Sequence, residues 1–236
     1  MGISVAASAP APDAPLNEQM GWLDTQTLAF GRGLAELRFD SDALAVEIGL
    51  TEKLTCFEAR QISQPFAHRA HCLLAGRMAV SAATYVPLVA STSDHSDSTL
   101  EIPYFGNTRF RIEGKDWFDR AGQQAIYLPG QSCSVETSHF NGLLFNLNPH
   151  RLATTISEVS RHRVPLELAE RWVQRPVAID LADPRVKHLQ RYLESGLQNL
   201  ALLHGIGSGH PDAPLALGVE TLAYRSSARM IAIALG

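Results

Sequence analysis

The nine histidines are the first residues of this sequence that could bind a metal ion or transfer a proton. The closest group is His68, His71 and Cys72, while His139 and His150 stand apart. Zinc requires three or four convergent ligands, and the spacing of His68 and His71 does not supply them. The sequence also has no H-x-H pair. We therefore expect no metal site and no cofactor.

Nucleophilic and acid–base catalysis are not indicated either. The sequence has no G-x-S-x-G motif and no cysteine placed near a histidine in a context that would activate the thiol. Four carboxylates, Glu101, Glu113, Asp116 and Glu136, fall in strand-like runs and could share one face of a sheet. Nothing in their spacing brings two of them together, so we expect solvated carboxylates and no catalytic residues.

Aromatic residues in the same region are suited to a ligand pocket, which requires an apolar cavity with a few polar groups. The predicted binding residues are Tyr104, Phe110, Arg109, Tyr127 and Phe145. Trp117 is a further aromatic candidate, and Arg109 or Arg111 is available for an anionic group. The alternative is that the aromatic side chains only pack the core.

Short strands must position these residues. From Arg77 to Asn148, alternating or apolar runs are divided by turn residues every 8 to 12 positions, a pattern typical of a sandwich or small barrel. In "TRFRI", Phe110 and Ile112 fall on one face and the two arginines on the other. Leu128-Pro129-Gly130 forms a corner between two runs.

Helices are predicted after the strands. Asn148 is suited to an N-cap with Pro149 at the first helical position, and Asp183-Pro184 opens a later helix in the same way. "PLELAERWV" predicts a short helix between them, and "HGIGSGHPDAP" predicts a loop before a last helix. An apolar stripe on the Asp183-Pro184 helix either packs on the barrel or forms a dimer seam. The stripe consists of Leu189, Leu193, Leu197 and Leu200.

Composition narrows the class of protein. The chain has 236 residues, 45% of them hydrophobic, and a net charge of -4 without a basic block, which does not favour nucleic-acid binding. No apolar run is long enough for a membrane span, and the Pro/Ala-rich residues 1–20 predict a disordered leader without a secretory signal. Three widely spaced cysteines fit free thiols in a reducing compartment, so we expect a cytoplasmic protein.

The order of these elements resembles that of a known protein family. With "LEIPYFGNTRFRIEGK", "AIYLPGQSCSVET" and "GLLFNLNPHRLATTI", residues 55 to 235 resemble the N-terminal ligand-binding and dimerisation domain of AraC-type transcription regulators. The resemblance implies an α+β fold, a cupin-like β-barrel followed by a C-terminal helical hairpin. It also implies a small-molecule effector and a homodimer. The family's helix-turn-helix domain would begin where this sequence ends at Gly236, so we expect no direct DNA binding by this chain alone.

The expected organisation is a leader at 1–20, a cupin-like β-domain at 21–148 and a helical dimerisation region at 149–236 packed on the barrel. The predicted function is the effector-binding and dimerisation module of an AraC-family regulator, not an enzyme. One alternative is a small cupin enzyme acting on a small organic acid or sugar. Cupin barrels often hold a metal through an H-x-H pair, so its absence counts against a metal enzyme. A second alternative is a stand-alone protein that heterodimerises with full-length regulators.

Overall fold

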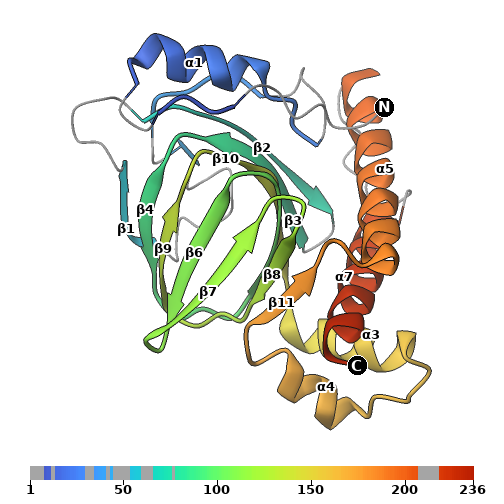
Figure 1. The fold of residues 1–236 in the computed structure, drawn as a ribbon. Coiled ribbons are helices and arrows are strands. Elements are labelled where there is room, and N and C mark those ends of the chain that lie inside the picture. The colour runs from blue at the N-terminus through green and yellow to red at the C-terminus, as the bar shows by residue number, and fades with distance from the viewer. Residues whose placement is uncertain are drawn as a thin grey trace.

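The computed structural model describes residues 8–11, 14–29, 35–40, 43–44, 54–59, 66–75, 78–206 and 218–236, with only the backbone for 54–59, 75 and 200–206. The helix at Leu16–Thr25 precedes the strand series, and the helices from Pro149 onward follow it (Figure 1). The elements in chain order are α1 (Leu16–Thr25), β1 (Leu54–Ala59), β2 (His68–Ala75), β3 (Met78–Tyr85), β4 (Leu88–Thr92), β5 (Ser98–Phe105), β6 (Asn107–Ile112), β7 (Lys115–Arg120), β8 (Gln124–Leu128), β9 (Cys133–Thr137), β10 (Phe140–Leu147), α3 (Pro149–Val159), α4 (Leu166–Trp172), β11 (Val177–Asp180), α5 (Pro184–Ile206) and α7 (Val219–Leu235).

The strands form one antiparallel sheet that curls into a half-open barrel (Figure 1). Its strand order is β1-β4-β9-β6-β7-β8-β5-β10-β3-β2, with β11 paired to β8. Curling brings β4 opposite β3 and β10, so Leu88, Tyr85 and Leu144 pack together on the inside. Strand β6 shows the alternation that the sequence predicts. Phe110 and Ile112 are buried on one face, and Arg109 and Arg111 are exposed on the other. The expected combination of a curled β-sheet and C-terminal helices is therefore confirmed.

Both faces of several strands are buried, because helices cover the outer face of the sheet. Helix α7 packs against α3, α5 and β11, and α4 packs against α3. Outward-facing residues of β5 and β10, such as Ile102 and Phe145, join Ile156 of α3 and Ile231 of α7 in one apolar cluster. The sheet therefore separates two cores, one inside the barrel and one beneath the helices.

The predicted helix starts are confirmed. Asn148 caps α3, with its side chain accepting a hydrogen bond from the Arg151 N–H at 2.9 Å. Proline begins α5 at residue 184, and α4 covers the run predicted to be a short helix. Of the predicted loop at 204–214, residues 204–206 belong to the end of α5 and the rest lies outside the described residues.

Two boundaries differ from the sequence prediction. Residues 16–20, expected in a disordered leader, belong to α1, because Trp22 and Leu23 of this helix bury their side chains against the sheet. In the region expected to be helical, β11 adds a strand to the sheet, and its Val177 and Ile179 are buried. A four-residue strand with two apolar positions is too short to show a distinct period in the sequence.

The leucine stripe of α5 lies in the core of the chain itself. Leu189, Leu193 and Leu197 are 8%, 1% and 1% exposed and belong to the cluster beneath the helices. The side chain of Leu200 lies outside the described residues. Of the two interpretations of the stripe, packing within the chain is therefore correct for these three residues. This burial leaves the three leucines almost no exposed area for the dimer seam predicted from them.

Candidate ligand-binding site

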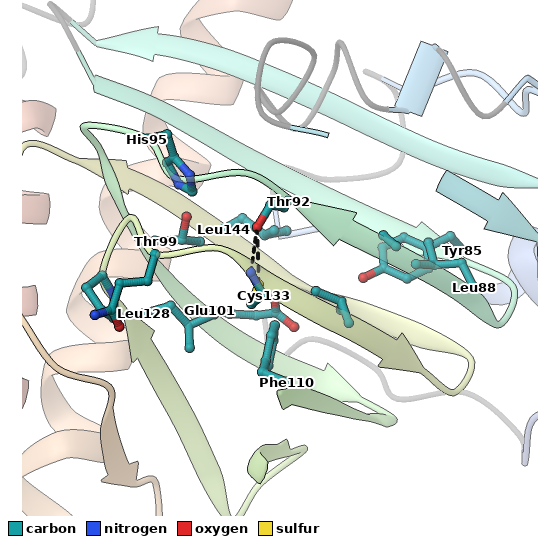
Figure 2. A pocket seen from close by; sticks show the side chains of 14 residues that line it. Tyr85, Leu88, Thr92, His95, Thr99, Glu101, Phe110, Leu128, Cys133 and Leu144 are labelled. Atoms are coloured by element: carbon teal, nitrogen blue, oxygen red, sulfur yellow. Dashed lines mark hydrogen bonds between the residues drawn. The ribbon is translucent and has the colours of Figure 1, made fainter. Parts of the chain in front are cut away.

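The inside of the barrel contains a cavity of about 70 Å³. Its walls are mostly apolar and come from both halves of the curled sheet (Figure 2). The lining residues are Tyr85, Leu88, Ala90, Thr92, His95, Thr99, Glu101, Phe110, Leu128, Pro129, Gln131, Cys133, Val135 and Leu144. An apolar cavity with a few convergent polar groups is the usual form of a small-molecule site.

A hydrogen-bonded loop positions His95 at one end of this cavity. The His95 N–H donates to the Gly130 carbonyl at 2.7 Å, and His95 Nδ1 lies 2.9 Å from the Ser93 carbonyl. Because a carbonyl only accepts, the second contact requires a proton on Nδ1 and leaves Nε2 as the free ring nitrogen of the neutral form. Ser132 donates from its N–H to Asp94 Oδ1 at 2.6 Å, which ties the two loops together. His95 and Gln131 are partly exposed, so this is the solvent-facing end.

Glu101 is the only carboxylate among the described residues that line the cavity, and it is only 4% exposed. Figure 2 shows it between His95 at one end and Tyr85 at the other. Thr108 connects it to a second buried carboxyl, that of Asp119. The Thr108 hydroxyl donates to Glu101 Oε1 at 3.0 Å, and the Thr108 N–H donates to Asp119 Oδ1 at 2.6 Å. Strands β5, β6 and β7 thus place two acids side by side.

The two carboxyls share a proton. Asp119 is fully buried, and its Oδ2 meets no hydrogen-bond donor among the described residues unless Glu101 is protonated. Burial raises the pKa of Glu101 well above its usual value, and the neighbouring Asp119 raises it further. Burial also raises the pKa of Asp119, to about 6, against the opposing effect of hydrogen bonds from Glu101 and Thr108. Two adjacent buried acids cannot both ionise cheaply, so the pair keeps one proton and carries one negative charge between the two carboxyls.

The sequence predicts a solvated Glu101, and this prediction is wrong, because the side chain is buried. Its neighbours on β5 alternate between the two cores, so a charged residue in this strand is buried whichever way it points. Asp119 was missed altogether. The available signal was its position two residues after Trp117, which is the spacing that puts both side chains on the same face of a strand.

Of the aromatic residues predicted to bind a ligand, Phe110 alone lines the cavity. Tyr127 and Phe145 are fully buried on the opposite face of the sheet, where the Tyr127 hydroxyl donates to the Val173 carbonyl at 2.8 Å. Tyr104 lies on that face too, packed against the cluster beneath the helices. These three residues pack the core beneath the helices. Trp117 packs beside Phe110 inside the barrel without lining the cavity.

The two arginines predicted to hold an anionic group lie outside the barrel. Arg109 forms an exposed ion pair with Glu136, and Arg111 Nε lies 2.8 Å from Asp116 Oδ1. Since alternate residues of β6 face opposite ways, neither reaches the cavity next to Phe110. No lysine or arginine lines the cavity among the residues that the structure describes.

Histidines and cysteines are dispersed. In the described parts of the chain, no three His, Cys, Asp or Glu side chains come together as a metal-binding group. His139 is buried against α1, where Nε2 contacts Gln19 Oε1 and the ring meets Trp22 edge-on at 4.9 Å between centroids. Cys133 lines the cavity at 3.3 Å from Thr92 Oγ1, and burial raises the pKa of its thiol. A raised pKa keeps the thiol protonated and poorly nucleophilic.

Comparisons with known proteins bear on the fold. No family model matches the sequence, and no curated protein matches it. The crystal structure of the AraC-like transcriptional activator CuxR superposes with a TM-score of 0.59 at 8% identity, over 84% of this chain and 70% of the activator. A putative ethanolamine utilization protein from Salmonella typhimurium has a TM-score of 0.30 at 17% identity, over 35% of this chain and 69% of its own. A cupin-like protein from Thermotoga maritima has a TM-score of 0.27 at 13% identity, over 36% and 74%.

The likeness to the activator is one of fold, since so few residues are identical. It extends over most of the chain and therefore includes helices as well as the curled sheet. Among the described residues, no helix has the length and apolar character needed to cross a membrane.

Proposed function

We propose that this chain is the effector-binding and dimerisation module of an AraC-type transcription regulator. The fold likeness to an AraC-like activator supports the class of protein. The observation that carries the ligand-binding role is the apolar cavity inside the barrel with the buried Glu101 in its wall. A bound effector would favour one of two arrangements of the module and so change how attached DNA-binding domains are disposed.

The cavity limits the size of the effector. A single water molecule requires roughly 10–15 Å³ of such space. The 70 Å³ in the barrel therefore has room for a molecule of about five non-hydrogen atoms. Phe110 and Leu144 would contact its apolar part, and Glu101 would orient its polar group.

A ligand screen with matched variants tests this role. Thermal shift with a library of small metabolites should yield compounds that stabilise the wild-type chain. Ala90→Leu adds bulk to the cavity wall, so it should abolish the shift, whereas Ala178→Leu, at an exposed position of β11, should retain it. Leu144→Phe fills the same space from β10 and serves if Ala90→Leu does not fold. Stabilisation that survives both filling variants would contradict binding in the barrel.

Dimerisation remains part of the proposal, although the leucine stripe does not provide the contact. The exposed side of α5 carries Tyr192, which is 60% exposed and is the most exposed aromatic residue of the helix region among the described residues. Light scattering over a range of concentrations should show a homodimer. A chain that stays monomeric at high concentration would contradict this part of the proposal. By itself the chain should show no sequence-dependent DNA binding. The titration is done at about 0.15 M salt, because non-specific phosphate binding weakens steeply with salt.

The buried acid pair favours a second candidate, a small cupin enzyme acting on a small organic acid or sugar. Two adjacent carboxyls that share a proton are a common arrangement for acid–base chemistry. The two candidates differ in what happens to the bound molecule. A regulator should return its ligand unchanged after long incubation with the protein, whereas an enzyme should convert it, as NMR of the recovered ligand would show. Conversion that is lost in Glu101→Gln would decide for the enzyme.

A further inference from the structure

We propose that the cavity binds a small organic cation, an amine with a short apolar body, whose ammonium group is held by Glu101 with Asp119 behind it. This inference rests on the proposed effector-binding role of the cavity and names the chemical class of its ligand.

The charge at the site is negative. With one shared proton, the Glu101–Asp119 pair carries one negative charge inside the barrel. The other titratable groups around Glu101 are Tyr85 from β3 and Cys133 from β9, and burial raises the pKa of both, so both are neutral. His95 lies at the solvent-facing end. An anionic ligand would meet this negative charge without a lysine or arginine among the described lining residues to offset it.

The two acids have unfilled hydrogen-bonding capacity. Thr108 supplies one donor to each carboxyl, which leaves further lone pairs on both. Asp119 Oδ2 has no donor among the described residues other than a protonated Glu101. An ammonium group has three N–H donors and no acceptor, which is the complement of a carboxylate that lacks donors.

The remaining walls of the cavity are mostly apolar and aromatic. The body of the ligand would lie among Leu88, Ala90 and Leu144, with the rings of Tyr85 and Phe110 close by. Aromatic faces attract cations as well as apolar groups. The size limit of about five non-hydrogen atoms corresponds to an alkylamine such as isobutylamine.

Protons and the cation compete for the same two carboxyls. As pH rises through about 6, the pKa of Asp119, the pair goes from neutral to one negative charge. Amine binding should therefore strengthen with rising pH, as long as the amine itself stays protonated, and should release protons from the pair to the solvent. Neither effect is expected for an uncharged ligand of the same shape.

The experiment compares three compounds with one carbon skeleton: isobutylamine, isobutanol and isobutyrate. Titration calorimetry of the wild-type chain at pH 7.5 and millimolar ligand should show the amine binding at least about tenfold more tightly than the other two, a difference typical of one charge-assisted contact. Glu101→Gln should remove this preference and leave isobutanol within about threefold of its wild-type affinity. Glu136→Gln, an exposed carboxylate on β9 paired with Arg109, is the matched control and should change nothing.

The outcomes separate this inference from the proposed function. Equal or tighter binding of isobutanol or isobutyrate, lost in Ala90→Leu, would overturn the cation inference and leave the effector pocket standing. Failure of all three compounds, while the metabolite screen yields a cavity-dependent ligand of another class, would also overturn the inference alone. If Glu101→Gln does not fold, the wild-type chain still decides: amine affinity that does not rise between pH 6 and pH 8 contradicts the proposal.

Discussion

Gly130 lies directly against the backbone carbonyl of His95. A Cβ atom at Gly130 would come within 2.0 Å of His95 O and 2.5 Å of Asp97 O, while the His95 N–H donates to the Gly130 carbonyl at 2.7 Å. The Leu128-Pro129-Gly130 corner therefore requires glycine because of a neighbouring loop, and this contact holds His95 at the end of the cavity.

Gly130→Ala should destabilise the protein by about 1–3 kcal/mol, because backbone atoms must move to admit the methyl group. Denaturant titration measures the change in the free energy of unfolding. Gly21→Ala is the matched control: its position in α1 is exposed with no atom within 4 Å of an added Cβ. Alanine should stabilise that helix by up to about 1 kcal/mol. Equal effects of the two variants would contradict the close approach at Gly130.

Leu193 should behave as a core residue. Leu193→Ala should cost about 2–5 kcal/mol of stability, and Leu193→Glu should prevent folding, since a charge would be buried without a partner. Tyr192→Ala, at the adjacent exposed position of α5, should change monomer stability by no more than about 0.5 kcal/mol. Circular dichroism and urea titration give these values. A folded, monomeric Leu193→Glu protein would restore the dimer seam that the sequence predicted.

The buried acid pair should make the protein less stable as pH rises. The folded-state pKa values of Glu101 and Asp119 are raised, so the folded protein keeps protons that the unfolded chain has lost. This contribution to stability is complete below the unfolded pKa values near 4 and is lost as pH rises through the folded values, with that of Asp119 at about 6.

Glu101→Gln tests this pH dependence, because glutamine imitates the protonated acid at every pH. The variant should gain stability relative to wild type between pH 5 and pH 8 in urea titrations. If the free energy of unfolding of the variant instead falls relative to wild type as pH rises, an ionised Glu101 stabilises the fold.

His139 should act in the opposite direction. Burial lowers its pKa from 6.5 to about 4, so the unfolded chain takes up a proton that the folded protein does not. Its contribution to stability is complete above pH 6.5 and declines as pH falls towards 4, by at most about 1.4 kcal/mol per pH unit. His68 has a similarly lowered pKa of about 4, so wild type must be compared with His139→Gln. The difference in stability between them should shrink from pH 7.5 to pH 5, and a constant difference would contradict the prediction.

Local signals in the sequence determined the beginnings of the helices and the alternation of the strands. The caps at Asn148 and Asp183, and the exposed–buried pattern of β6, depend on neighbouring residues and on backbone geometry. Such interactions reach only a few positions along the chain, so the sequence shows them directly.

Only the tertiary structure decided which face of each strand encloses the cavity. Alternation groups Tyr104 with Ile102 and Glu101 with Thr99, but it does not say which group faces inward when helices bury the other side. The same limit explains the leucines of α5, because a narrow apolar stripe packs equally well on its own chain or on a partner. It also explains why the pairing of Glu101 with Asp119 was not predicted. Thr108 of β6 donates a hydrogen bond to Glu101 of β5 and another to Asp119 of β7. The pairing therefore depends on the curl of the sheet and on no local pattern.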